Sequence, residues 1–377
     1  MSLLRDITSD DIERVMQAHF DPVSGAVYWI NYAREKGFKP SDVHGLEDFI
    51  SIVTPTGKRA EEYERDLAHA PLDSFMPHWL RDQVSSGSEH IYPGETGGTT
   101  GAYPKRGYYS DRVWSQQLAF GNEDLNIAGI PEGINWIWAG PTGPHAIGRY
   151  ALELPRLRGG MAFPLDLDTR WIKIAMAELG GLTGDAFTRY MGHIAQQMAR
   201  LLEKEDIQAI FTTSVILQRL EEVAEKVGFD LSELQGILHG GTALMPPEHQ
   251  VLREEMLPCV PFTGLYGSSI TGADSFQKPL EPEDEFAVVY VPNSPMIHLR
   301  IVDPTTKEDV GFGEEGQVVR YRFTDDFLVP GLEERDLATK VKPYGRYAEQ
   351  LPGDFWLANI HSAARQLKGQ DEVQGVY

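Results

Sequence analysis

The spacing of apolar residues changes twice along the chain. Between about Asp10 and Arg81 apolar residues recur at helical spacing, as at Ile12, Val15 and Met16, and the polar run at 9–11 can cap a helix there. A second helix with a charged face is expected at 60–69. The first 90 residues are therefore predicted to be mainly helical.

Short apolar runs alternate with helical patterns over residues 91–275. Strands are expected at 134–139, 209–213, 236–239 and 260–265, and helices at 166–179, 183–204, 214–227 and 246–256. Strand–helix alternation with short connections indicates a parallel α/β sheet. Ligands bind beyond the carboxyl ends of such strands, where Gly240-Gly241 and Tyr266-Gly267 fall.

Alternation with a period of two begins near Glu285. The runs 286–290, 297–302 and 317–323 predict a smaller antiparallel part. We therefore expect one domain over 1–345, made of a mainly helical part (1–90), an α/β part (91–275) and a β-rich part (276–345). Residues 346–377 are expected to form a short C-terminal tail, long enough for a helix but not for a domain.

Composition narrows the class of protein. Of 377 residues, 41% are apolar and 24% are charged, which is ordinary for a globular protein, and no run is long and apolar enough to cross a bilayer. The start has no secretory signal, and the single cysteine, Cys259, excludes a disulfide framework. We expect a cytoplasmic protein without a membrane partner. The net charge of -22 argues against nucleic acid.

The segment TGGTTGAYPK at 96–105 is rich in Gly and Thr and ends in a lysine. Glycine lets backbone N–H groups wrap an oxyanion, threonine hydroxyls donate further hydrogen bonds, and Lys105 and Arg106 add positive charge to an acidic chain. The spacing does not match a Walker A loop. The pattern predicts a polyphosphate-binding loop, and the alternative is a surface turn of similar composition.

Three motifs in order resemble the ANL adenylate-forming superfamily. They are TGGTTGAYPK at 96–105, YGSS at 266–269 and the run at 311–338, in which Asp336 stands at the aspartate of a Thr-Gly-Asp motif. The resemblance covers roughly residues 20–345. GPTGPHAIG at 140–148 is similar to the phenylacetate–CoA ligase branch, and within it to the adenylating proteins of phenazine antibiotic (griseoluteic acid) biosynthesis.

This resemblance implies a fold and an activity. The fold is an α/β fold, the large N-terminal domain of adenylate-forming enzymes, with parallel α/β sheets, a smaller antiparallel β subdomain and no C-terminal domain. The activity is ATP-dependent activation of an aromatic carboxylic acid, such as a phenazine carboxylate, as acyl-adenylate with release of pyrophosphate. ATP and Mg²⁺ are implied as cofactors. A small aromatic acid and an acceptor or downstream biosynthetic protein are implied as partners, and a homodimer is left open.

The resemblance also assigns roles to residues of this chain. The β- and γ-phosphates would be held by Thr96, Gly97, Gly98, Thr99, Thr100, Gly101 and Lys105. The rest of the nucleotide would meet Gly240, Gly241 and Thr242 at adenine, Tyr266, Gly267 and Ser268 beside it, and Asp336 at the ribose. The catalytic residues would be Lys105, Ser269 and His145, and the substrate pocket would hold Trp138, Gly140, His145 and Phe262.

Each of these residues also has a plain structural interpretation. Tyr266 could be a core aromatic, His145 a hydrogen-bonded structural histidine, and one ring of the pair Trp136 and Trp138 would point away from a pocket. Asp336 stands in a charged run, which is usually solvated surface.

Three departures from the family pattern bear on the activity. Ala102 and Tyr103 lengthen the exit of the phosphate loop, which affects the reach of Lys105. The glutamate that would bind Mg²⁺ is Ile270, which cannot coordinate a hard cation, and Asp274 could replace it only on a helical backbone. The chain also stops before the C-terminal domain of its relatives, so we expect the thioester step to occur outside this chain.

Two alternatives to an acyl-adenylating enzyme remain. The first is a complete aryl-CoA ligase, against which the expected lack of a C-terminal domain counts. The second is a non-catalytic nucleotide or aromatic-acid binding or carrier protein that retains the adenylating fold. Ile270 favours the binding protein, whereas the Gly/Thr-rich loop favours the enzyme.

Overall fold

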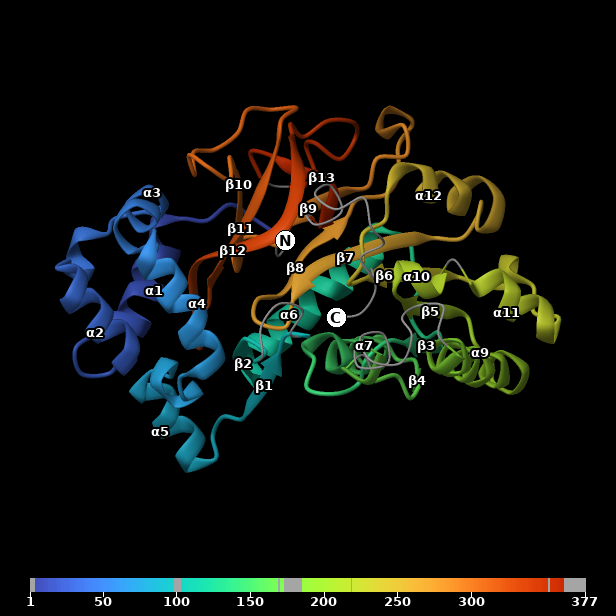
Figure 1. The fold of residues 1–377 in the computed structure, drawn as a ribbon, viewed down its shortest axis with the longest axis horizontal. Coiled ribbons are helices and arrows are strands. Elements are labelled where there is room, and N and C mark those ends of the chain that lie inside the picture. The colour runs from blue at the N-terminus through green and yellow to red at the C-terminus, as the bar shows by residue number, and fades with distance from the viewer. Residues whose placement is uncertain are drawn as a thin grey trace.

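The computed structural model describes residues 4–97, 103–168, 170–172, 185–217, 219–351 and 353–362. Five helices gather at one end of the molecule and most later helices at the other, with the strands between them (Figure 1). The α-helices are α1 (Ser9–Phe20), α2 (Val27–Lys36), α3 (Leu46–Asp48), α4 (Lys58–His69), α5 (His78–Ser86), α6 (Asp111–Ile127), α7 (Ala146–Leu157), α9 (Asp185–Lys204), α10 (Ser214–Leu217), α11 (Leu220–Val227) and α12 (Pro246–Val251).

The strands form a two-stranded and an eleven-stranded sheet. β1 (Ile91–Glu95) pairs with β2 (Arg106–Ser110) as an antiparallel hairpin. The large sheet has the order β10-β11-β12-β13-β9-β8-β7-β6-β5-β3-β4. Its strands are β3 (Trp136–Ala139), β4 (Ala162–Pro164), β5 (Ala209–Thr212), β6 (Gly236–Gly240), β7 (Phe262–Ser268), β8 (Gly272–Gln277), β9 (Val289–Pro292), β10 (Ile297–Val302), β11 (Glu315–Phe323), β12 (Leu328–Val341) and β13 (Trp356–Ser362).

The parallel and antiparallel parts belong to one hydrogen-bonded sheet. Strands β4, β3, β5, β6 and β7 are parallel, and from β8 onward every pairing is antiparallel. The change of direction occurs because β7 continues to Ser268 and returns directly as β8 from Gly272. The strand expected at 260–265 therefore extends further than predicted, to Ser268, and residues 269–271 form the turn.

Part of the expected C-terminal tail is a strand inside the sheet. β13 lies between β12 and β9, where Trp356 and Leu357 are fully buried. An apolar segment supplies both backbone pairing and core, so these residues belong to the domain. The prediction of a short tail from residue 346 is thus wrong for residues 356–362.

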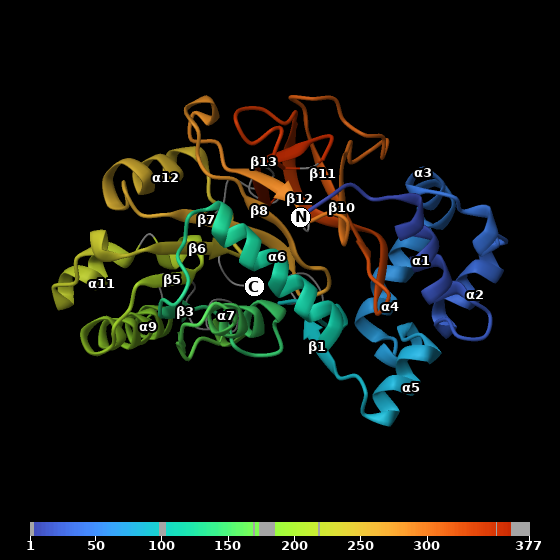
Figure 2. The ribbon, with the colours of Figure 1, turned by 180° about the vertical axis from the view of Figure 1, so that it is seen from behind.

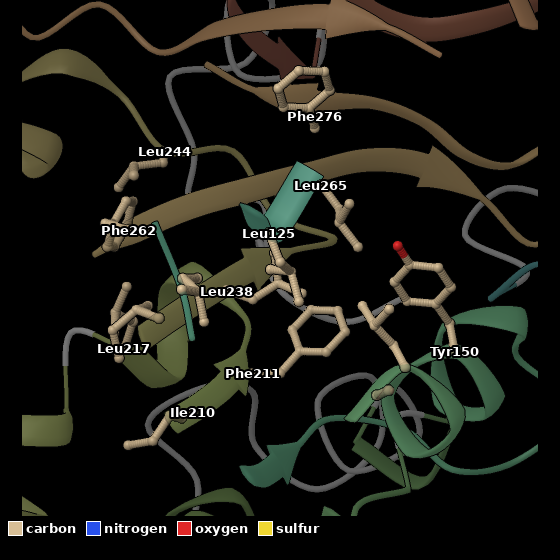
Figure 3. Close-up of a cluster of buried hydrophobic side chains, with 14 of the residues drawn as sticks. Leu125, Tyr150, Ile210, Phe211, Leu217, Leu238, Leu244, Phe262, Leu265 and Phe276 are labelled. Atoms are coloured by element: carbon tan, nitrogen blue, oxygen red, sulfur yellow. The ribbon is translucent and has the colours of Figure 1, made fainter. Parts of the chain in front are cut away.

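Two hydrophobic clusters hold the elements together. The larger one surrounds the parallel strands and is shown in part in Figure 3. The other joins the N-terminal helices to β11 and β12, with Ile12 and Trp29 meeting Tyr321, Leu332 and the turn residue Ile270. The helical end is therefore packed onto the antiparallel end of the sheet.

Local chemistry fixes several helix boundaries. α1 starts after Thr8, whose hydroxyl accepts a hydrogen bond from the Asp11 backbone while the Asp11 carboxylate accepts one from the Thr8 backbone. The expected helix at 214–227 is present as two pieces, α10 and α11, and the one at 246–256 ends in a π-helical turn at Leu252–Met256. Most of the expected helix at 166–179 lies outside the described residues.

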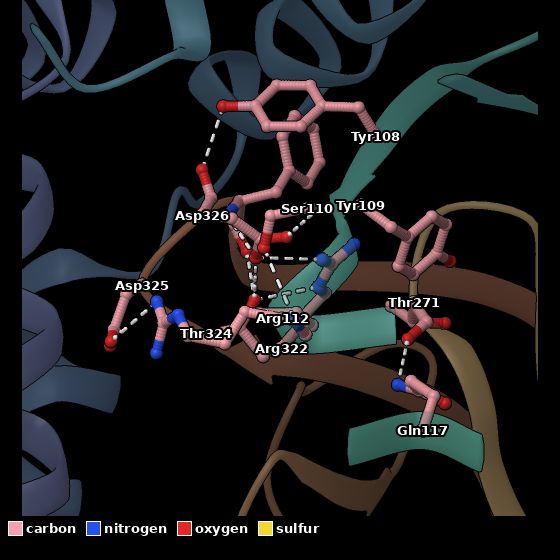
Figure 4. A network of polar contacts seen from close by, with 12 residues as sticks. Tyr108, Tyr109, Ser110, Arg112, Gln117, Thr271, Arg322, Thr324, Asp325 and Asp326 are labelled. Carbon is pink, nitrogen blue, oxygen red and sulfur yellow. Dashed lines mark hydrogen bonds and ion pairs between the residues drawn. The ribbon is translucent and has the colours of Figure 1, made fainter. Parts of the chain in front are cut away.

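A buried polar network ties β2 to the loop between β11 and β12 (Figure 4). The Arg322 Nη2 atom lies 2.9 Å from Asp326 Oδ1, and both side chains are fully buried. The other Asp326 oxygen accepts from the Ser110 backbone at 2.8 Å, and Tyr108 Oη donates to the Asp326 carbonyl at 2.7 Å. Because these groups are mutually satisfied, the network fixes β2, which follows the phosphate loop.

None of the helices in the described part of the chain has both the length and the apolarity needed to cross a bilayer.

Candidate active site

The predicted phosphate loop connects β1 to β2, and its two ends are held together. The Thr96 backbone N–H donates to the Lys105 carbonyl at 2.9 Å, and the Lys105 N–H donates to Thr96 Oγ1 at 3.0 Å. Gly97 follows Thr96 as the last described residue on this side. The other predicted loop residues lie outside the described residues: Gly98, Thr99, Thr100 and Gly101. The hairpin therefore supplies a fixed base for this loop.

Lys105 has a partner on the helical part of the chain. Its Nζ lies 3.2 Å from Glu64 Oε2 of α4, and both side chains are partly exposed. Such an ion pair stabilises by only about 0–1 kcal/mol, so the Lys105 ammonium can leave Glu64 at little cost. The neighbouring Arg106 donates to the Ala70 carbonyl at 2.8 Å, which makes it a structural contact.

His145 lies beside the entrance of the same loop. It is the N-cap residue of α7 and is buried, and its Nδ1 is 3.2 Å from the Glu95 carbonyl. The Glu95 backbone N–H in turn donates to the Pro144 carbonyl at 2.8 Å. The structure therefore brings together two motifs, at 96–105 and 140–148, that the sequence places about forty residues apart.

The β7–β8 turn lies against the β1–β2 hairpin, which carries the predicted phosphate loop. Tyr109 of β2 donates from its hydroxyl to the Ser269 carbonyl at 3.2 Å. A Cβ atom on Gly94 would lie 2.5 Å from that same carbonyl oxygen, so only glycine permits this approach. Ser268 Oγ lies 2.9 Å from Thr271 Oγ1 and accepts from the Ile270 and Thr271 backbones, which shapes the turn that presents Ser269.

Gly267 is required by the hairpin itself. A Cβ atom there would lie 1.9 Å from the Gly272 carbonyl oxygen, at the point where the β7–β8 register shifts. The close approach that Gly267 permits in the structure is that of the neighbouring strand's backbone.

Tyr266 and Asp336 are joined by a side-chain hydrogen bond. Tyr266 Oη donates to Asp336 Oδ2 at 2.9 Å, although the two residues come from β7 and β12. Partial burial raises the pKa of Asp336, and the nearby Arg320 guanidinium opposes this. Asp336 is 29% exposed and lies beside Tyr266 and Arg320, so it is a half-buried, paired carboxylate and not a freely solvated one.

Arg320 of β11 contacts both members of this pair. Its guanidinium carbon lies 4.3 Å from the centroid of the Tyr266 ring, and its Nη2 is 3.7 Å from Asp336 Oδ2. Its Nη1 makes an ion pair of 2.7 Å with Asp274, and both side chains are buried. Sequence reasoning missed Arg320, although an arginine within an apolar strand pattern is a signal for a buried charge network.

The structure shows the surroundings of Ile270 and Asp274, the two positions considered for a Mg²⁺ ligand. Ile270 is fully buried among the helical cluster, and Asp274 lies on strand β8, not on a helix. Burial raises the pKa of Asp274 to about 6 while Arg320 opposes it, and the carboxylate faces Arg320. Neither residue fits Mg²⁺, and the described residues contain no cluster of three or more His, Cys, Asp or Glu that could hold a metal ion. We therefore derive no step through a protein-bound metal.

The predicted adenine segment ends β6 next to this hairpin. Gly240 pairs with Leu265 of β7, and Gly241 adopts a φ of 76°, which favours glycine. Thr242 accepts the Ser214 backbone N–H through Oγ1 at 2.8 Å and the Ser214 hydroxyl through its carbonyl at 3.2 Å. The segment is therefore held at the carboxyl edge of the parallel strands.

A cavity of about 70 Å³ lies where these segments meet. Gly241, Gly267, Ser268 and Ser269 line one side of it. The remaining walls come from α6, α7, β7 and the first residues of β8: Trp114, Gln117, Ala146, Ile147, Tyr150, Leu265, Gly272 and Ala273. Sequence reasoning missed Trp114, Gln117 and Tyr150. Trp114 and Gln117 stand three residues apart, a spacing that places them on one face of a helix, and this is the signal that the sequence carries.

None of the four predicted pocket residues lines that cavity, and His145 is only the chain neighbour of its lining residue Ala146. Trp138 is fully buried with its ring 4.5 Å from that of Phe211, and a Cβ atom on Gly140 would lie 2.3 Å from the Trp138 ring. Phe262 begins β7, whereas Ser268 ends it, and Figure 3 shows Phe262 and Tyr150 on opposite sides of the core cluster. The structure brings neither Trp138 nor Phe262 together with His145.

Comparison with solved structures identifies the fold. 2-Hydroxyisobutyryl-CoA ligase in complex with 2-HIB-AMP and CoA, in the thioesterification state, superposes with a TM-score of 0.68 at 17% identity, over 94% of this chain and 67% of that chain. In its postadenylation state with 2-HIB-AMP the TM-score is 0.66 at 14% identity, over 93% and 65%. The chain thus spans about two thirds of the length of these neighbours.

No protein-family model and no curated protein sequence matches the chain. The fold therefore rests on the structural likeness, which extends over nearly all of this chain. The expected fold class is confirmed: the chain has the α/β fold of the large N-terminal domain of adenylate-forming enzymes.

Proposed function

We propose that the chain activates a carboxylic acid with ATP. A carboxylate oxygen attacks the α-phosphorus, the bond between that phosphorus and the oxygen leading to the β-phosphate breaks, and acyl-adenylate and pyrophosphate form. This reaction asks the protein to align the attacking and leaving oxygens and to stabilise phosphate charge, with little covalent work. The observation that carries the proposal is the convergence of the phosphate hairpin, the Ser268–Ser269 turn and the Tyr266–Asp336 pair at one edge of the sheet.

The residues take separate roles in this proposal. Thr96, Gly97 and Lys105 hold the β- and γ-phosphates together with residues 98–101, with Lys105 leaving Glu64 to do so. Ser269 lies beside the α-phosphate, Tyr266 stacks near adenine between Gly241 and Asp336, and the Asp336 carboxylate accepts from ribose hydroxyls. These assignments join the sequence resemblance to the contacts described above.

His145 and the 70 Å³ cavity are the proposed site of the acid. We infer an aromatic acid, with a phenazine carboxylate as the candidate that the sequence resemblance implies, and the rings of Trp114 and Tyr150 offer an apolar wall. The cavity has about half the volume of the roughly 150 Å³ apolar cavity that binds benzene in another protein, so a phenazine would fit only if the walls move. An acceptor or downstream protein of antibiotic biosynthesis would then take the acyl group.

Ile270 supports a second candidate function, the binding of nucleotide and acid without turnover. At the place where the family pattern has a metal-binding glutamate, the chain has a fully buried aliphatic side chain. A binding or carrier protein needs no metal to neutralise charge in a transition state.

Acid-dependent exchange of labelled pyrophosphate into ATP separates the two candidates. The panel should contain short aliphatic acids, benzoate and phenazine carboxylates, with Lys105→Ala as the loop variant and the exposed Lys58→Ala as its matched control. Exchange with one acid, lost in Lys105→Ala alone, is the expected result. ATP binding by calorimetry without exchange for any acid would favour the binding protein.

A further inference from the structure

A second and larger cavity lies outside the candidate active site. Its volume is about 380 Å³, within the roughly 300–1,000 Å³ range of small-molecule sites. It is formed by the N-terminal arm, α1, one face of α6 and the segments 295–296 and 323–325, and it shares no lining residue with the 70 Å³ cavity.

Three arginines and two aspartates face this cavity. Arg5 Nη1 lies 2.6 Å from Asp11 Oδ2, Arg112 Nη2 lies 3.1 Å from Asp325 Oδ2, and Arg14 forms ion pairs with both aspartates. Three positive charges therefore meet two negative ones. The two carboxylates are 7% and 15% exposed, whereas each guanidinium side chain is 45–48% exposed, so the surplus positive charge lies at the opening.

This surplus is unusual for the chain as a whole. With a net charge of -22, the surface mostly repels anions, and a local excess of arginine must be held against mutual repulsion. Arg112 and Arg5 both lower the pKa of Arg14, in addition to its burial. An anion with two or more oxygens would relieve this repulsion, because each planar guanidinium can donate two parallel hydrogen bonds to a carboxylate or phosphate.

The other walls of the cavity are largely apolar. Side chains from α6, from the 295–296 segment and from the end of β11 supply this surface: Val113, Ala119, Phe120, Pro295, Met296 and Phe323. A ligand that fits must therefore join a charged group to an apolar body.

Helix α6 forms a wall of both cavities. Arg112, Val113 and Gln116 face the larger cavity, whereas Trp114 and Gln117 face the smaller one. In Figure 2 the helix runs across the middle of the molecule, in front of the strands. Arg112 also reaches Asp325, next to the Asp326 that holds the Ser110 backbone before α6 (Figure 4). A ligand in the larger cavity would therefore contact the same helix, α6, that lines the smaller cavity.

We propose that this 380 Å³ cavity binds a small amphipathic organic anion, a carboxylate or phosphate monoester with an apolar body, whose charged group is held by Arg5, Arg14 and Arg112. The proposal stands independently of acyl-adenylate formation, because it uses none of the residues assigned to ATP or to the acid.

Calorimetry with phenyl phosphate and benzoate as probes tests this site and distinguishes the two kinds of anion. Arg112→Gln should weaken binding of the preferred probe at least tenfold, because a charged hydrogen-bond partner is lost. Arg189→Gln is the matched control, since Arg189 is exposed on α9 and pairs with Asp185 alone among the described residues. Unchanged affinity in Arg112→Gln, loss of binding in Lys105→Ala, or no saturable binding of either probe would overturn the proposal.

A steric variant keeps the test valid if the arginine variant is unstable. Gln116 is exposed on α6, so Gln116→Trp should fold while filling the cavity from its rim. It should weaken phenyl phosphate binding severalfold without changing any charge. Equal affinity of wild type and Gln116→Trp for phenyl phosphate would contradict a ligand seated in this cavity, as would equal affinity for inorganic phosphate and phenyl phosphate.

Discussion

Ile270→Glu restores the glutamate of the family pattern and tests whether this position can act as a metal site. The Ile270 side chain is fully buried in the cluster that joins the N-terminal helices to β11 and β12. Its Cγ2 atom would lie 3.4 Å from a Cβ atom on Gly107, so the space is filled on that side. Arg322 is close, donating to the Ile270 carbonyl at 2.8 Å, but its charge is already paired with Asp326.

The cost of this change has two parts. Removing a buried isoleucine loses about 1.5–3 kcal/mol of apolar burial. A glutamate in its place would be buried as the neutral acid, and protonating a carboxyl of ordinary pKa about 4.3 at pH 7 costs roughly 3.7 kcal/mol. Partial relaxation towards solvent reduces the sum, so we expect a loss of about 4–6 kcal/mol in the free energy of unfolding.

Urea denaturation followed by tryptophan fluorescence measures this loss. Ile270→Leu is the matched control, and a volume-conserving swap should cost less than about 1.5 kcal/mol. We expect Ile270→Glu to shift the midpoint strongly and to leave Mg²⁺-ATP binding no tighter than in wild type. A glutamate variant as stable as Ile270→Leu, or one that binds Mg²⁺-ATP more tightly than wild type, would refute the burial argument.

Three further predictions concern buried or partly buried charged and titratable groups. Asp336→Asn should weaken ATP binding about tenfold by calorimetry, because hydrogen bonds to a charged group contribute about 1.5–3 kcal/mol, and unchanged affinity would move the ribose contact elsewhere. Arg320→Met should lower the free energy of unfolding by about 3–5 kcal/mol by leaving a buried carboxylate unpaired, and adding Asp274→Asn should recover part of it; a double variant less stable than Arg320→Met would contradict the pair. Burial lowers the pKa of three histidines, His19, His239 and His298, from 6.5 to about 4, so the unfolded chain binds more protons between these two pH values. The free energy of unfolding should therefore decrease as the pH is lowered, by about 3–4 kcal/mol from pH 7 to 5.5, of which Asp274, with its raised pKa, returns about 1. A free energy of unfolding that stays level or rises over this range would contradict this.

Local patterns predicted much of the fold because they carry their own periodicity. The helix with Ile12 and Val15 and the strand at 297–302 appear as expected, since each buries one face that the sequence marks. β12 was missed because its burial pattern is irregular, and a charged run at Glu333–Asp336 lies within it. Its buried neighbours come from β11 and β13, which only the folded sheet supplies.

Some residues of the candidate site could be predicted from local sequence patterns, and others could not. Glycine-rich segments that need special backbone geometry, such as Gly241 and Gly267, were found from sequence because few other residues fit there. The Arg320–Tyr266–Asp336 arrangement was not found, since it joins three strands through side chains far apart in the chain. Phe262 was placed at the wrong end of its strand for the cavity, because composition does not say which end of a strand faces a ligand.

Isotope transfer tests the proposed chemistry most directly. The carboxylic acid that supports pyrophosphate exchange is labelled with heavy oxygen in its carboxylate, incubated with ATP and the protein, and the product is trapped with hydroxylamine, which attacks the acyl carbon. If the carboxylate attacks the α-phosphorus, the AMP that is released carries one heavy oxygen and the acid leaves as hydroxamate. Unlabelled AMP, or the formation of ADP and phosphate in place of AMP and pyrophosphate, would contradict acyl-adenylate formation by this chain.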